Sequence, residues 1–156
     1  MKKYLRLLIA LALPLGVGTL SALLTRDSMA VFSVLEKPPL SPPAWLFPVA
    51  WSVLYVLMGL ASYLVWTAPR GSGRLRPALG AYLLQLAVNF FWSIIFFSLE
   101  RYLLAFGWLV LLWALIAITA VRFYRIRKAA GWLMMPYLAW VTFAGYLNFF
   151  IWLLNK

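Results

Sequence analysis

The sequence predicts an all-α fold, a bundle of five transmembrane helices in an integral membrane protein. Five apolar stretches fill most of the 156 residues, and each is close to or above the roughly 20 residues that a helix needs to cross a bilayer. The last four contain no charged residue, and the first contains only Arg6. Because a soluble helix keeps a polar face, we expect these stretches to lie in lipid. Residues 1–156 are predicted to form one membrane domain with spans at about 5–24, 45–66, 79–99, 102–121 and 129–154.

The first span follows Lys2-Lys3, a pattern that also opens a secretory signal peptide. Its apolar run is about 20 residues, longer than a usual signal-peptide core, so we expect it to be retained. The next loop has four prolines within residues 37–43, which favours a stiff, extended path. Two interpretations stay open: a lid over the outer mouth of the bundle, or a linker that ends the helix, which composition favours.

The remaining connections are short. Residues 67–77, rich in Gly, Pro and Arg, form a flexible connector between the second and third spans. Only Glu100-Arg101 separates the third span from the fourth, which predicts a tight antiparallel hairpin. The basic segment 122–128 leads into the fifth span.

Charges alternate along these connections. All three acids and four cations fall on one side: Arg26, Asp27, Glu36, Lys37, Glu100, Arg101 and Lys156. The other ten cations fall on the opposite side: Lys2, Lys3, Arg6, Arg70, Arg74, Arg76, Arg122, Arg125, Arg127 and Lys128. This pattern follows the positive-inside rule and predicts a cytoplasmic N-terminus and an outer C-terminus. The net charge of +11 is therefore expected to meet lipid head groups rather than nucleic acid.

Composition excludes several chemistries. The chain has no Cys and no His, which removes thiol catalysis and the commonest ligands of zinc and haem iron. No carboxylate lies inside a span and no phosphate-binding Gly-Lys-Ser/Thr loop is present. The sequence therefore offers no usual proton relay and no built-in ATPase.

Tryptophans and amides suggest an inner site. Four indoles lie near span ends, as expected at a membrane interface: Trp45, Trp66, Trp132 and Trp152. Four lie deeper and would wall a pocket for a flat aromatic ligand if they converge, although helix packing or lipid contact is the alternative: Trp51, Trp92, Trp113 and Trp140. Gln85, Asn89 and Ser93 repeat every four positions, so their helix face should point into the bundle, where interhelical hydrogen bonds are the simplest role.

Four motifs together resemble the TspO/MBR family of tryptophan-rich sensory proteins and mitochondrial translocator proteins (peripheral benzodiazepine receptors). They lie in the loop between the first two spans (loop one) and in spans two, three and five: Lys37-Pro-x-x-x-Pro-Pro43, Trp51-x-x-x-Tyr55, Gln85-Leu-x-x-Asn89-x-x-Trp92-x-x-x-Phe96-Phe97 and Pro136-Tyr-Leu-x-Trp140-x-x-Phe-Ala144-x-x-Leu-Asn148.

The resemblance implies a membrane protein, here in a bacterial cell membrane and often a homodimer, that binds porphyrins and hydrophobic drugs in a sensory or transport-related role. No cofactor is required, and protoporphyrin IX or haem is the expected ligand. The implied ligand-binding residues are Trp51, Tyr55, Asn89, Trp92, Trp140, Ala144, Leu147 and Asn148. The alternative it carries is a light- and oxygen-dependent porphyrin-degrading enzyme in which Trp51 and Trp140 are the catalytic residues.

The chain also departs from the family pattern. Val31-Phe32 stands where the family has Trp-Tyr, and Leu40 replaces a Trp, so two lid aromatics are lost. After Leu147 no Tyr precedes Lys156, so the cholesterol-recognition pattern of animal members is missing and sterol binding is not supported.

Overall fold

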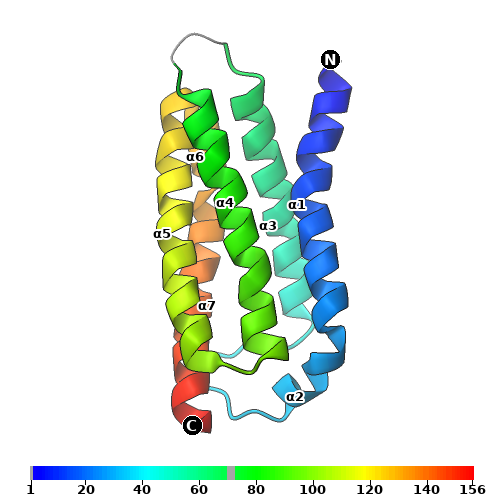
Figure 1. Ribbon diagram of the computed structural model, residues 1–156, viewed down its shortest axis with the longest axis vertical. Coiled ribbons are helices and arrows are strands. Elements are labelled where there is room, and N and C mark those ends of the chain that lie inside the picture. Colours follow the sequence, from blue (N-terminus) through cyan, green and yellow to red (C-terminus); the bar gives the residue numbers. More distant parts are fainter. Residues whose placement is uncertain (1, 70–72) are drawn as a thin grey trace.

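The computed structural model describes residues 2–69 and 73–156 and is a bundle of long helices running roughly side by side (Figure 1). Over the described residues, five helical segments are long and apolar enough to cross a membrane: Lys3–Ser33, Leu46–Trp66, Leu75–Ser98, Tyr102–Ile126 and Lys128–Asn155. The N- and C-termini lie at opposite ends of the bundle (Figure 1), as an odd number of crossings requires. The predicted all-α membrane fold is confirmed.

The first segment contains three helices: α1 (Lys3–Thr25), the short turn η1 (Arg26–Ser28) and α2 (Met29–Ser33). α1 packs on α3 (Leu46–Trp66). Gly59 of α3 allows the two helices to approach closely. A Cβ at this position would lie only 2.8 Å from the backbone oxygen of Ala10. Loop one, between α1 and α3, is tethered to α7 (Met135–Asn155), because the Tyr146 hydroxyl donates a hydrogen bond to the Pro39 carbonyl over 2.7 Å.

The third span begins earlier than predicted. α4 runs Leu75–Ser93, four residues ahead of the expected start, and Pro77 lies in its first turn. Proline is tolerated there because a first-turn N–H has no partner within the helix. α4 continues as a π-helical segment, η2 (Ile94–Ser98), and the hairpin closes at Glu100, whose φ is +54°.

The fourth and fifth spans also differ in detail. α5 (Tyr102–Ile126) extends five residues beyond the predicted end. The fifth segment is interrupted at Met134, between α6 (Lys128–Leu133) and α7 (Met135–Asn155). Pro136 explains the interruption, since it cannot donate to the carbonyl four residues before it.

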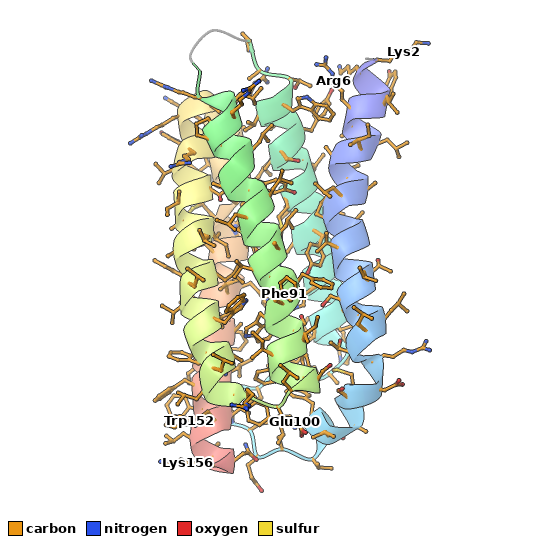
Figure 2. All side chains as sticks on the ribbon, in the orientation of Figure 1. Lys2, Arg6, Phe91, Glu100, Trp152 and Lys156 are labelled. Atoms are coloured by element: carbon orange, nitrogen blue, oxygen red, sulfur yellow. The ribbon has the colours of Figure 1, made fainter. Side chains whose placement is uncertain are left out.

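The two ends of the bundle differ in charge. Lys2 and Arg6 lie at one end, and Glu100 and Lys156 lie at the other (Figure 2). The α4 N-terminus and the α5–α6 junction share the end of the N-terminus (Figure 1), so the described basic segments gather there. Arg70 lies outside the described residues. Successive connections along the chain thus lie at alternate ends of the bundle, as the alternation of their charges predicted.

Candidate ligand-binding site

A cavity of about 360 Å³ opens at the end of the bundle that carries α2. It lies among α1, α3, α4–η2 and α7, and residues of η1 and α2 also line it. Twenty residues line it: Gly18, Ser21, Ala22, Thr25, Arg26, Met29, Phe32, Phe47, Pro48, Trp51, Tyr55, Trp92, Ser93, Phe96, Phe97, Trp140, Ala144, Leu147, Asn148 and Ile151.

Three of the four deep indoles converge on this cavity. Trp51, Trp92 and Trp140 line it from α3, α4 and α7. Trp113 does not line it, so the expectation of one wall made of four converging indoles is wrong for this residue. It is 42% exposed and its Nε1 donates to Thr142 Oγ1 over 2.8 Å, on the outer side of α5 and α7. Trp113 therefore fits the alternative role of packing and lipid contact.

The cavity walls are built from ring pairs. Trp51 stacks on Tyr55 with ring centroids 5.6 Å apart and planes 29° apart. Trp92 stacks on Phe96 at 5.2 Å, also at 29°. Phe47 meets Trp140 edge to face at 6.0 Å. Such paired rings restrain one another, so the cavity presents flat aromatic surfaces in fixed orientations.

The amides serve as supports for the walls. Asn148 accepts a hydrogen bond from Trp92 Nε1 over 3.0 Å and donates from Nδ2 to the Tyr102 carbonyl over 2.8 Å. This pair fixes the Trp92 ring between α4, α5 and α7. Removing the amide would leave an indole N–H without its acceptor inside the bundle.

Asn89 is the one predicted binding residue that does not line the cavity. Its side chain is buried and donates from Nδ2 to the Tyr137 hydroxyl over 2.9 Å. That hydroxyl donates in turn to Gln85 Oε1 over 2.7 Å. The spacing of Gln85 and Asn89 correctly predicts an inward face, and the interhelical hydrogen bonding suggested as their simplest role is what the structure shows.

Two lining residues differ from the others in their polar groups. The Trp140 Nε1 atom is buried and has no hydrogen-bond partner among the described residues. Arg26 is the only charged residue among those that line the cavity, and it belongs to η1 at the mouth. The lining therefore carries one cation, at the mouth, and a few polar side chains among mostly apolar and aromatic ones.

The covering of the cavity comes from α2 and not from the proline run. Phe32 lines the cavity and packs edge to face against Phe97 at 5.4 Å. No residue in 37–43 is among those that line it, and the Tyr146 hydroxyl holds this run against α7 at Pro39, which favours the linker interpretation. Of the departing pair Val31-Phe32, one aromatic ring still reaches the site.

Sequence reasoning missed several lining residues, notably Arg26, Met29, Phe47 and Ile151. Nothing in their local pattern separates them from ordinary packing residues. Phe96 and Phe97 appear in the quoted motif, and the π-helical turn that contains them brings both to the cavity. Over the described residues no group of three or more His, Cys, Asp or Glu side chains could hold a metal ion.

Comparisons with known proteins agree with the motifs. A model of the TspO/MBR family matches residues 10–153. The tryptophan-rich protein TspO of Chlorobaculum tepidum is 36% identical over 155 residues, which cover 99% of this chain and 98% of that protein. The tryptophan-rich sensory protein of Cereibacter sphaeroides is 40% identical over 132 residues (85% and 80% of the two chains), and the translocator protein of Bos taurus is 37% identical over 150 residues (92% and 86%). This chain is an integral membrane protein and belongs to the TspO/MBR family.

Proposed function

We propose that the cavity binds porphyrins and similar flat, hydrophobic molecules, and that binding serves a sensory or transport-related role. The observation that carries the proposal is the convergence of Trp51, Trp92 and Trp140 on one space of about 360 Å³. Ligand cavities usually measure about 300–1,000 Å³ and are lined mainly by apolar and aromatic side chains with few polar groups. A tetrapyrrole matches this lining because it is flat, aromatic and apolar over most of its surface.

The polar groups suggest how such a ligand is oriented. A carboxylate of the porphyrin would meet the Arg26 guanidinium at the mouth, where a charge-assisted hydrogen bond is favourable. Since the chain has no His or Cys, haem would be held through its ring face and carboxylates rather than by the usual axial ligands.

The names of the relatives favour binding over catalysis. They describe sensory and translocator proteins, and none of the three names an enzyme. Trp51 and Trp140 both line the cavity, but indoles cannot act as general acids or bases. Porphyrin photodegradation stays an untested hypothesis.

The membrane setting follows from the charge pattern and the relatives. We place the N-terminus in the cytoplasm and the C-terminus outside a bacterial cell membrane, because the basic end should face the cytoplasm. The cavity would then open toward the outer side. A homodimer stays a prediction.

The test is an equilibrium titration of protoporphyrin IX into the detergent-solubilised protein, followed by quenching of tryptophan fluorescence. Ala144 lines the cavity, so Ala144→Leu should fill part of it and weaken binding at least about tenfold, as a loss of about 1.4 kcal/mol does. Gly145→Ala is the matched control, since its Cβ would make only ordinary contact, 3.9 Å from Leu109. Equal affinities for the two variants would place the ligand elsewhere.

A further inference from the structure

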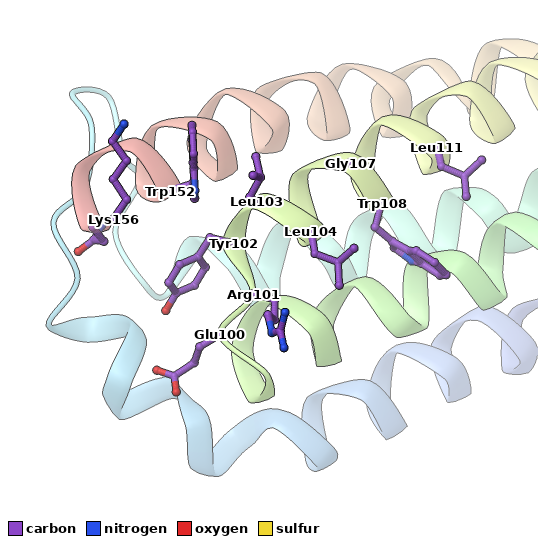
Figure 3. Close-up of a pocket in the computed structure, with 11 residues that line it drawn as sticks. Glu100, Arg101, Tyr102, Leu103, Leu104, Gly107, Trp108, Leu111, Trp152 and Lys156 are labelled. Carbon is purple, nitrogen blue, oxygen red and sulfur yellow. The ribbon is translucent and has the colours of Figure 1, made fainter.

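A second hollow, of about 820 Å³, lies on the outside of the bundle at the α4–α5 hairpin (Figure 3). It runs along the first turns of α5 and reaches Trp152 and Lys156 at the end of α7. None of its lining residues belongs to the inner cavity. The hollow is therefore separate from the porphyrin site proposed above.

Both signs of charge stand at the mouth of this hollow. Glu100 and Arg101 are adjacent, exposed and line it. Lys156 is a second exposed cation on its lining, with its ammonium over the Trp152 ring at 5.2 Å from the ring centroid. No salt bridge joins Glu100 or Arg101 to another of the described residues. Glu100 also has a positive φ of +54°, in the left-handed region that a residue with a side chain rarely adopts. The hairpin thus holds an unpaired carboxylate and an unpaired guanidinium at the membrane interface.

Below the charges the wall is apolar. Leu104, Trp108 and Leu111 follow at helical spacing along α5, and Figure 3 shows Leu104 and Trp108 continuing from Arg101 along the helix. Trp108 is fixed because its Nε1 donates to the Val88 carbonyl over 2.7 Å, which leaves no free polar group on its ring. Gly107 keeps the groove open, since a Cβ there would meet nothing within 4 Å.

We infer that this groove binds a phospholipid with a phosphoethanolamine head group, its phosphate at Arg101, its ammonium at Glu100 and one acyl chain along Leu104–Leu111. Charge complementarity selects this occupant. A choline head group has no N–H to donate to the carboxylate. A glycerol head group can place its phosphate at Arg101, but it has no cation to pair with the Glu100 carboxylate.

The test is native mass spectrometry of the full chain in mild detergent with dioleoyl phosphatidylethanolamine, phosphatidylcholine or phosphatidylglycerol. The wild type should retain one phosphatidylethanolamine per chain, about tenfold more tightly than either other lipid, as expected for a hydrogen bond between charged groups. Glu100→Gln should abolish this preference. Gly107→Leu should lower retention of all three lipids, whereas Gly80→Leu, at another position where a Cβ meets nothing within 4 Å, should leave it unchanged.

Four outcomes would overturn the inference. Equal retention of the three lipids by the wild type would mean that the groove holds only unselected bilayer lipid. Wild-type retention by Gly107→Leu would place the lipid elsewhere. A dimer that Gly107→Leu converts to a monomer, with no lipid retained by the wild type, would assign the groove to a second copy of the chain. If Gly107→Leu does not fold, Glu100→Gln decides alone, since its side chain is exposed, and an unchanged preference refutes the site.

Discussion

Gly18 of α1 packs directly on Tyr55, a ring that lines the cavity from α3. A Cβ at Gly18 would lie 2.7 Å from Cδ2 and 2.9 Å from Cζ of Tyr55, and closer still to Cε2. Carbon atoms in contact normally stay about 3.5–4.0 Å apart, so Gly18→Ala must shift the ring or separate the helices. Because Tyr55 is stacked on Trp51, a shifted ring disturbs the cavity wall.

The magnitude follows from a comparison with Gly16, where a Cβ would meet nothing within 4 Å. Both alanine variants gain about 0.5–1 kcal/mol of helix stability relative to glycine, so their difference isolates the packing effect. Overpacking costs about 1–3 kcal/mol. We therefore expect Gly18→Ala to be less stable than Gly16→Ala by about that amount and, because the Tyr55 ring shifts, to bind protoporphyrin more weakly.

The assays are detergent-based unfolding and the fluorescence titration described above, with both variants measured under identical conditions. Gly16→Ala should match or exceed the wild type in stability and should bind normally. If the two variants are equally stable and bind equally well, α1 does not contact Tyr55 as described, and the assignment of this part of the cavity wall is wrong.

Three further predictions concern the polar core and the topology. Tyr137→Phe removes the hydroxyl that joins Gln85 to Asn89 and should destabilise the protein by about 1–3 kcal/mol; unchanged unfolding would show that the network is dispensable. Asn148→Leu removes the acceptor of Trp92 Nε1 and should weaken protoporphyrin binding while Trp113→Phe leaves it unchanged; the reverse order would contradict the site. Since the chain has no native Cys, single cysteines at exposed Ala44 and Pro69 can be labelled with an impermeant maleimide in intact cells; labelling of Pro69→Cys but not Ala44→Cys would invert the proposed topology.

Hydropathy was sufficient to predict the five spans because a lipid-facing helix must be apolar over its whole length. Helix ends were less predictable. Pro77 marks a turn in many sequences, yet here it occupies the first turn of α4, where its missing N–H has no consequence. The break at Met134 depends on Pro136, and an apolar stretch gives no sign of whether a proline interrupts or begins a helix.

The site was only partly predictable, for a different reason. The position of an indole in the sequence shows how deep it lies in a span but not which way its helix is rotated. The sequence therefore did not reveal that Trp113 faces outward while Trp140 faces the cavity. Helical spacing predicted that Asn89 points inward. How far the cavity reaches along the bundle depends on tertiary packing, and Asn89 lies beyond it, bonded to Tyr137. Phe32 reaches the site because α2 forms within loop one, which its proline-rich sequence did not suggest.

The central claim is that a porphyrin occupies the space between the three converging indoles. The most direct measurement is to illuminate a stoichiometric protoporphyrin complex briefly and to map oxidised tryptophans by peptide mass spectrometry, since the bound ring generates reactive oxygen beside its neighbours. Trp51 and Trp140 line the cavity, whereas Trp113 and Trp132 lie outside it and are exposed. We expect Trp51 and Trp140 to be oxidised first and Ala144→Leu to suppress this order. Oxidation of Trp113 or Trp132 ahead of them, unaffected by Ala144→Leu, would contradict binding in the cavity.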